Sequence, residues 1–433
     1  MSRTQSASRH RQRGAAALIV VVVLFFILAL VTAYAGRNLI FEQRTSVNNQ
    51  RTAQAFEAAD SGLDFAIALL SGGRVDAACA STTSTAFDTF RQRHLTTDAN
   101  GNYTTPGAKA ILQPSCMLLA DGARCSCPDA GAPTLIAPVG GLTPTFQVHF
   151  DTAGLAPQPG IVRAISRGCS SMGSECYAAA PNKADAVAEV SVLLGLNSAL
   201  ATPPSAALTV LGELNANGGA LTVVNSDVQS LGITIDAGGE IINDGNVRLS
   251  RLPGTPGSLS VLKNDPSLRD AANQPWTADQ MFRSVFGMER ANYRSQPAAV
   301  QVTCAGSCAA QINAAIRQNP GRIIWVQGPA TIDSDVVHGP PEPPVMLLVS
   351  GDLTVTAALQ VEGVLYVQGS SVTWVNNNAG STRIQGAMVA DGDLAVHGAP
   401  TIVFDPGVLR TINQTQGSLV RIPGSWRDFA AGS

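Results

Sequence analysis

The residues of this sequence best suited to chemistry are its eight cysteines. Cysteine thiols oxidise to disulfides or, as thiolates, bind zinc. Zinc sites usually contain a C-x-x-C pair or a nearby set of histidines, and neither pattern occurs among these cysteines. The spacing therefore favours disulfides, and disulfides indicate an oxidising compartment outside the cytoplasm.

The pairing of the cysteines is only partly predicted by their spacing. Two pairs are close in sequence: Cys169 with Cys176, and Cys304 with Cys308. The other four form a cluster: Cys79, Cys116, Cys125 and Cys127. A single residue separates Cys125 from Cys127, so they are too close to bond each other comfortably. Each is expected to bond one of the other two cysteines in the cluster, which leaves two connectivities open.

Side chains that could carry out hydrolysis are few. Between residues 345 and 404 the acids, with one arginine and one histidine, are Asp352, Glu362, Asp391, Asp393, Arg383 and His397. Most of these acids lie beside glycines, where turn formation explains them. No nucleophile is paired with a base, and no calcium-loop or phosphate-loop motif occurs. The sequence predicts no catalytic residue, no metal site and no cofactor.

Charge and composition narrow the class of protein further. Only 14% of the 433 residues are charged and the net charge is −3, which argues against a nucleic-acid partner. The length allows two or three packed units. Glycine (41 residues), proline (25 residues) and abundant aliphatic side chains suit many short strands joined by tight turns.

The N-terminus combines a basic leader with an apolar run. Residues 1–14 hold four arginines and no acid, and the 21 residues from 15 to 35 carry no charge. As a helix, this run would span about 31 Å, the thickness of a bilayer core. Arginines before a span keep that end in the cytoplasm, so the rest of the chain is expected outside it.

The helix is expected to continue beyond the membrane, to residue 71. Residues 36–70 contain no proline, and apolar side chains recur at steps of three and four: Phe56, Ala59, Leu63, Ile67 and Leu70. Such a stripe is typical of a helix packed under a globular head. Gly72-Gly73 would end the helix.

Three interpretations of this N-terminus compete: a plain membrane anchor, a cleaved secretory signal and a prepilin leader. Ala33-Tyr34-Ala35 would be the signal-peptidase site, but the apolar run is longer than the core of a signal peptide. A signal peptide also has no reason to run into an amphipathic helix. A prepilin peptidase cuts after a glycine on the cytoplasmic side of the run, where Gly14 precedes Ala15.

Two motifs flank the helix-forming segment. Arg13-Gly14-Ala15 precedes the apolar run, and Ala55-Phe56-Glu57-Ala58-Ala59-Asp60-Ser61-Gly62-Leu63 follows it. Over about the first 70 residues the sequence resembles the PilX-type minor pilins of type IV pili. In that family the same glycine junction opens the span, and an A-F-x-A-A-(E/D)-x-G-L block closes the helix. The tail Pro423-Gly424-Ser425-Trp426-Arg427-Asp428-Phe429 also resembles C-terminal segments of the family.

The resemblance implies how the protein is processed, where it is located and which proteins it assembles with. It implies cleavage by prepilin peptidase between Gly14 and Ala15, a stage in the bacterial inner membrane with the head in the periplasm, and a final place in a pilus at the cell surface. The implied partners are other minor and major pilins and an adhesin-like tip protein. The implied role is pilus priming or assembly, with adhesion or surface contact through the head and no catalysis.

One residue departs from the pattern of major pilins. They usually carry glutamate at the fifth residue of the mature chain, and Ile19 occupies that position here. A buried carboxylate is costly unless it is paired, as it can be with a neighbour's terminal amine. A subunit without it suits a rare or tip position, so a minor pilin is favoured.

After the helix, residues 74–200 are expected to form a disulfide-containing, pilin-type head. Residues 74–140 predict loops and short elements held by cysteines. Alternating apolar residues predict three antiparallel strands at 145–150, 160–167 and 185–194, which would form a small sheet on the helix stripe. Pro203-Pro204 marks a linker.

Residues 205–433 predict a β-solenoid-like domain with a helical insertion at about 270–320. Short apolar bursts between glycine, asparagine and aspartate turns fill residues 207–252 and return at 345–404. Such bursts suit stacked parallel rungs, with a flat sandwich as the alternative because the spacing is irregular. The predicted fold class is therefore α+β: a long transmembrane and amphipathic helix, then a β-rich head with a small antiparallel sheet and a β-solenoid-like C-terminal region.

Two classes of function are consistent with this organisation. The favoured class is a structural and assembly subunit, a minor pilin, with a type II secretion pseudopilin as the close alternative. The other class is a membrane-tethered β-helix enzyme that cleaves polysaccharides, which would need convergent acids and bases on one face.

Overall fold

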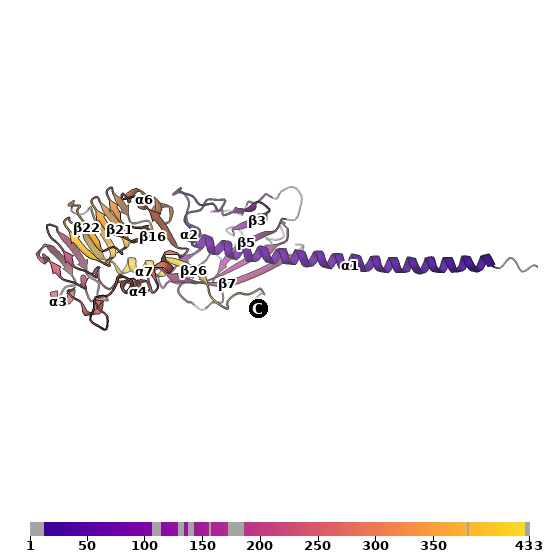
Figure 1. Cartoon of the computed structure of the whole chain (residues 1–433), viewed down its shortest axis with the longest axis horizontal. Coiled ribbons are helices and arrows are strands. Elements are labelled where there is room, and N and C mark those ends of the chain that lie inside the picture. The colour runs from indigo at the N-terminus through magenta and orange to yellow at the C-terminus, as the bar shows by residue number, and fades with distance from the viewer. Residues whose placement is uncertain are drawn as a thin grey trace, which may run out of the picture.

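A long N-terminal helix dominates the shape of the molecule. The computed structural model describes residues 13–105, 114–128, 134–136, 143–155, 157–171, 186–378 and 381–428. Helix α1 (Arg13–Leu70) projects from a β-rich head as a single rod (Figure 1). Its 58 residues extend about 87 Å at 1.5 Å per residue. The predicted long helix is confirmed.

Antiparallel strands of the head cover the C-terminal end of α1, in the order β26-β7-β6-β5-β3-β4 among the described residues. Their bounds are β3 Ser115–Leu119, β4 Gly122–Ser126, β5 Thr145–Asp151, β6 Ile161–Cys169, β7 Val187–Ser198 and β26 Gly417–Arg421. Alternate residues of β6, such as Val162 and Ala164, are buried toward α1, while Arg163 lies on the opposite face. The predicted small antiparallel sheet is confirmed, with β5, β6 and β7 as its three predicted strands.

Short elements connect α1 to this sheet. Thr89 and Gln92 form a capping box at the start of α2 (Phe90–His94), and β1 (Thr96–Thr97) pairs with β2 (Tyr103–Thr104). Phe90 is fully buried beside α1 and the sheet. These elements anchor the connection without adding to the sheet.

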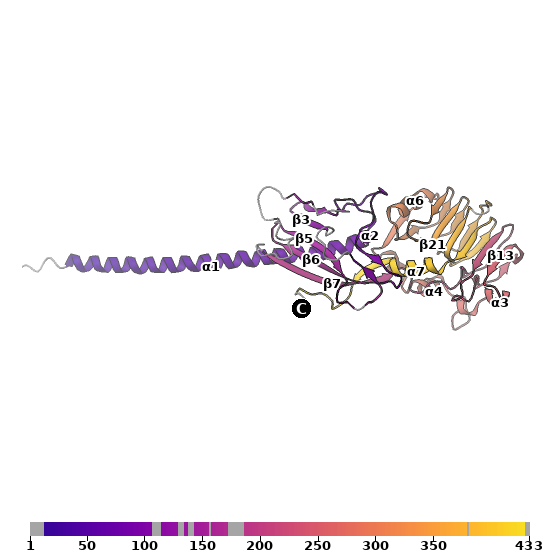
Figure 2. The same ribbon diagram turned by 180° about the vertical axis from the view of Figure 1, so that it is seen from behind.

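Beyond the sheet, parallel strands stack in rungs at the end of the molecule farthest from the helix N-terminus (Figure 2). One block contains β8 Leu208–Val210, β9 Leu214–Asn215, β10 Leu221–Asn225, β11 Ile235–Ala237, β12 Ile241–Ile242, β13 Val247–Arg251 and β14 Val261–Leu262. The second block contains β15 Ala299–Thr303, β16 Ile323–Gln327, β17 Ala330–Ile332, β18 Val336–His338, β19 Val345–Val349, β20 Leu353–Val355, β21 Leu359–Val367, β22 Ser371–Trp374, β23 Arg383–Ala390, β24 Asp393–Val396 and β25 Thr401–Phe404. The region is solenoid-like, because neighbouring rungs pair in parallel.

Glycines let neighbouring rungs approach closely. Gly363 and Gly386 face each other in β21 and β23. A Cβ on Gly363 would lie 1.8 Å from the carbonyl oxygen of Val345, and one on Gly386 would lie 2.0 Å from the carbonyl oxygen of Gly363. Only glycine fits at these two positions, which explains the glycine spacing of the two strands.

The rungs follow one another in space in a different order from the chain. β8 pairs with β23, and β10 pairs with β25, so the first block stacks on the last rung of the second block. On the other side of β8 and β10 lie β11 and β13. Along the stack, the order runs from β15 to β25 and then from β8 to β14.

Helices fill the predicted insertion and pack on the outside of the rungs. They are α4 Ala278–Phe286, α5 Arg290–Arg294 and α6 Ala309–Gln318. Phe282 and Phe286 pack against Tyr366 of β21, with ring centroids 5.6 Å and 5.0 Å from the tyrosine ring. β15 also lies inside this insertion, an element that the sequence did not predict.

The chain returns to the head near its C-terminus, contrary to the predicted domain boundary of 205–433. α7 (Pro406–Thr415) leads from β25 to β26, and β26 pairs antiparallel with β7. Past β26, the backbones of Arg427 and Ser191 exchange hydrogen bonds of 2.8 Å in both directions. The solenoid-like region is therefore inserted between two neighbouring strands of the head sheet.

Candidate functional site

The N-terminal half of α1 carries an apolar surface that no described part of the head covers. Residues 18–50 are exposed, and the large apolar side chains between Leu18 and Phe41 are 51–73% exposed. The helix is long and apolar enough to cross a membrane. A surface of this size is unfavourable in water, so lipid or protein must cover it.

The first part of this exposed segment is also free of charge. No Asp, Glu, Lys or Arg occurs from residue 15 to residue 36. Ile19, where a major pilin would carry glutamate, is 62% exposed. The predicted processing residues Gly14 and Ala15 lie in the first turn of α1, directly before this segment. From residue 15 to residue 36, the helix therefore presents an uncharged surface to the lipid or protein around it.

The other half of α1 lies so close to β6 that only small residues fit at the contact. Ala55 and Ala59 are fully buried. A Cβ on Gly168 of β6 would lie 2.1 Å from the carbonyl oxygen of Ala55 and 2.4 Å from the amide nitrogen of Ala59. A Cβ on Gly62 would lie 2.1 Å from Oγ of Ser166. The alanines and the glycine of the motif therefore permit close contact between helix and sheet.

This close contact corrects the predicted stripe. Ala59, Leu63 and Leu70 are buried as predicted, but Phe56 is 37% exposed and Ile67 is only half-buried. The buried face is turned toward the small side chains, because the sheet lies nearest to them. Phe56 instead projects at the edge of the contact.

The C-terminal segment fastens the head to α1. Trp426 packs against Phe56 with ring centroids 6.1 Å apart, and Arg421 forms an ion pair with Asp64 at 2.6 Å. Sequence reasoning noted the tail motif around Trp426 but missed β26. Leu419 was the available signal, since it is an apolar residue in a short strand-like run and is buried in the head core.

Disulfides link the loops of the head. The structure pairs Cys116 with Cys125, which lie directly opposite each other in β3 and β4, and Cys79 with Cys127. It therefore contains one of the two connectivities left open by the sequence. In the helical insertion, Cys304 pairs with Cys308. Cys169 is also in a disulfide, whereas its predicted partner Cys176 lies outside the described residues.

Three of the four acids considered for catalysis (Asp352, Asp391 and Asp393) and His397 make structural contacts in the rungs. Asp352 and Asp393 each accept a backbone N–H bond from a neighbouring rung. The His397 ring bonds a carbonyl oxygen of a neighbouring rung at 2.8 Å. Within the described part of the chain, no group of three or more metal-ligating side chains lies together.

Asp391 is the exception, because it is buried and does not simply form a turn. Its side chain is 1% exposed and pairs with Arg290 at 2.8 Å, and Arg290 also pairs with Asp279 at 2.8 Å. Tyr366 donates a 2.5 Å hydrogen bond to the same carboxylate. Burial raises the pKa of Asp391 to about 7, against the opposing effects of Tyr366 and Arg290. This cluster fastens the helical insertion to the rungs.

Comparison with known proteins identifies the N-terminal segment. Residues 13–64 match the PilX N-terminal family model, so the predicted resemblance to PilX-type minor pilins is confirmed over these residues. No curated protein matches the chain. The crystal structure of the competence-associated pilin ComZ from Thermus thermophilus aligns at 12% identity, over 87% of this chain and 97% of that chain, with a TM-score of 0.24. That TM-score is too low to establish a shared fold.

Proposed function

We propose that this protein is a minor pilin of a type IV pilus. One observation carries the proposal: a single unbroken helix is bare in one half, with an uncharged run from residue 15 to residue 36, and packed against a globular head in the other. A plain membrane anchor needs only the bare half. A pilin needs both halves, because the head must remain fixed to the helix when the bare half moves from lipid into a protein core.

The flanking residues support the same function. The motif that matches the PilX N-terminal model supplies the small residues at the contact between helix and sheet. Gly14 and Ala15 stand where a prepilin peptidase would cut, and the arginines before them favour a cytoplasmic leader with a periplasmic head. Ile19 favours a rare subunit, which would assemble beside other minor and major pilins and an adhesin-like tip protein.

The head would project at the surface of the filament, where it could take part in priming, adhesion or surface contact. Disulfides in its loops suit an exported domain. Asp352, Asp391 and Asp393 of the solenoid-like rungs are engaged in structural contacts, which favours a binding role for this region over polysaccharide cleavage.

Two measurements on the native protein test the proposal. Mass spectrometry of the mature chain is expected to show Ala15 as the first residue, and immunoblotting is expected to find the protein in sheared pili. A chain that begins at Gly36 would indicate secretory-signal cleavage and contradict the proposal. Recovery with type II secretion components, and not with pili, would favour a pseudopilin instead.

A further inference from the structure

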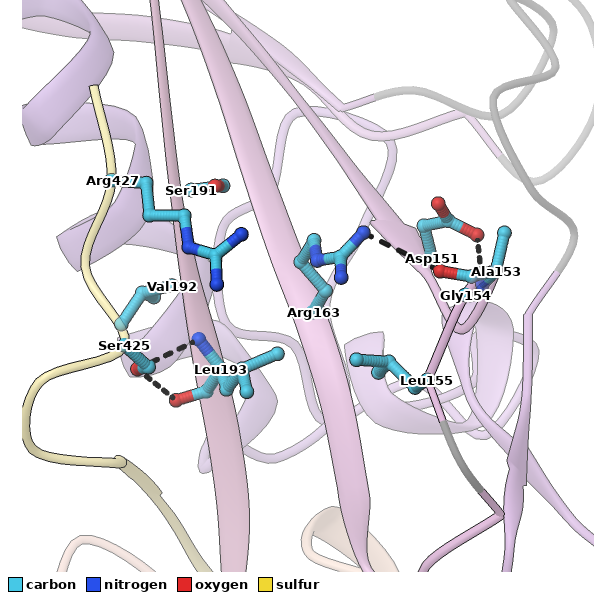
Figure 3. A pocket seen from close by; sticks show the side chains of 10 residues that line it. All are labelled: Asp151, Ala153, Gly154, Leu155, Arg163, Ser191, Val192, Leu193, Ser425 and Arg427. Atoms are coloured by element: carbon cyan, nitrogen blue, oxygen red, sulfur yellow. Dashed lines mark hydrogen bonds between the residues drawn. The ribbon is translucent and has the colours of Figure 1, made fainter. Parts of the chain in front are cut away.

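A hollow of about 590 Å³ lies on the head, between the outer face of the sheet and the C-terminal tail (Figure 3). Its walls come from the turn after β5, from β6 and β7, and from the tail. The hollow lies on the face of the sheet opposite α1, because the residues of β6 and β7 that face the helix are the alternate, buried ones. The packing of α1 on the other face of the sheet therefore does not cover the hollow.

Two arginines line this hollow, and neither has a carboxylate partner among the residues that the structure describes. Arg427 of the tail points toward β6, whereas the guanidinium of Arg163 on β6 is turned away from Arg427, toward Ala153 in the turn after β5 (Figure 3). Arg163 donates a 3.4 Å hydrogen bond to the carbonyl oxygen of Ala153. Arg427 is held through its backbone to Ser191, and its guanidinium has no acceptor among the described residues. Both guanidinium groups are thus available to an anion from outside.

The nearby acid does not neutralise them. Asp151 lies directly opposite Arg163 in the pairing of β5 with β6, yet its carboxylate accepts a 2.7 Å hydrogen bond from the backbone of Ala153. No ion pair joins Asp151 to either arginine among the described residues. The hollow therefore keeps a net positive charge.

The remaining walls are suited to a ligand with an apolar part. Leu155 and Leu193 line the hollow and are half-buried. The N–H of Leu193 is already bonded to Oγ of Ser425 at 3.1 Å, and the N–H of Ala153 to Asp151. With these donors occupied, the hollow lacks the ring of N–H groups that would surround a free phosphate.

We propose that this hollow binds an acidic peptide segment of a partner protein. A carboxylate would lie between the guanidinium groups of Arg163 and Arg427, and apolar side chains of the segment would lie against Leu155 and Leu193. Arginine is the residue best suited to bidentate carboxylate recognition. The helix from residue 36 to residue 54 would extend about 28 Å between the membrane and the head, so lipid headgroups are out of reach.

The test uses the full-length protein in detergent micelles and two fluorescent peptides, Ala-Glu-Leu-Glu-Ala and Ala-Gln-Leu-Gln-Ala. Fluorescence anisotropy is expected to show salt-sensitive binding of the glutamate peptide alone. Arg163→Gln and Arg427→Gln are each expected to weaken it about three- to tenfold, the loss of one charge-assisted contact. Arg124→Gln is the matched control, because Arg124 is 64% exposed and pairs with Asp121 away from the hollow.

Several results would overturn the assignment. Equal binding of both peptides, or unchanged binding in both arginine variants, would show that the hollow does not recognise carboxylates. Equally tight binding of inorganic phosphate would make it a free-anion site, and sedimentation of the protein with phosphatidylglycerol vesicles through these arginines would make it a lipid site. A thermal unfolding midpoint equal to that of the wild type is required of each variant, so that a loss of binding is not a loss of folding.

Discussion

Phe56 of α1 and Trp426 of the C-terminal tail meet edge to face, with their ring planes inclined by 75°. The contact joins the C-terminal tail to the N-terminal helix. Together with the ion pair between Asp64 and Arg421 and the pairing of β26 with β7, this contact attaches the C-terminal segment to both α1 and the head sheet. Because the solenoid-like region is inserted between β7 and β26, both of its connections to the head start at strands that contact α1.

Loss of the tryptophan is expected to loosen this closure. Trp426→Ala removes the aromatic contact, which is worth about 1 kcal/mol for a partly exposed pair. We expect faster trypsin cleavage at Arg427, followed by mass spectrometry of the products, with little change in the unfolding midpoint. Ile136→Ala is the control, because Ile136 is 85% exposed. Equal cleavage rates in the two variants would show that the ring contact does not hold the tail.

The contact between helix and sheet is expected to be much less tolerant of change. Gly168→Ala would place a methyl group 2.1 Å from the carbonyl oxygen of Ala55, so α1 must move away from β6. Forced overpacking of this kind typically costs about 1–3 kcal/mol. We expect a clear fall in the thermal unfolding midpoint, measured by circular dichroism in detergent.

The control for this clash is Gly245→Ala, because nothing lies within 4 Å of a Cβ built there. Its unfolding midpoint is expected to stay close to that of the wild type. If Gly168→Ala unfolds at the same temperature as this control, the helix does not lie as close to the sheet as the structure shows.

The elements of this fold were predictable where the pattern was local. The uncharged run from residue 15 to residue 35 specifies a helix by itself, and alternation specifies β5, β6 and β7. The order of the rungs was not predictable. An apolar burst marks a strand but does not identify the strand that it pairs with. The local sequence therefore did not predict that Leu208 would pair with Met388.

The contacts of the helix junction show the same limit. The helical spacing of apolar residues placed Phe56 on the buried stripe, whereas the closeness of Gly168 gave the buried positions to alanines. The disulfides of the four-cysteine cluster depended on the register of β3 with β4, which sets Cys116 opposite Cys125. Both facts come from tertiary packing, which spacing along the chain does not encode.

His94 is expected to make the stability of the head depend on pH. It is 5% exposed and stacks on Phe90 with ring centroids 4.4 Å apart. Burial, and secondarily the charge of Arg93, lowers the pKa of His94 from 6.5 to about 4. The unfolded chain therefore binds a proton between pH 6.5 and 4 that the folded head does not, so stability is full above pH 6.5 and falls below it.

The measurement is chemical unfolding of the full-length protein at pH 7.5 and pH 5. His94 is expected to contribute a loss of about 2 kcal/mol between these values, at 1.36 kcal/mol per pH unit below 6.5. His94→Phe keeps the ring stacking and cannot titrate, so its loss should be smaller by that amount. An identical loss in both proteins would mean that burial in the folded head does not lower the pKa of His94.

The bare half of α1 gives the most direct test of a place in a filament core. The uncharged surface from residue 15 to residue 35 must suit lipid first and packed protein later. Val23→Lys would cost about 2.5–3.5 kcal/mol near the bilayer centre and would find no acid in the span to pair with.

Ile19→Glu differs, because a glutamate there could pair with a neighbour's terminal amine. We expect the lysine variant to disappear from sheared pili and the glutamate variant to be recovered at the wild-type level or above, with each amount compared with the membrane fraction. If the lysine variant reaches pili at the wild-type level, the helix is not buried in a filament, and the protein is a membrane-anchored head.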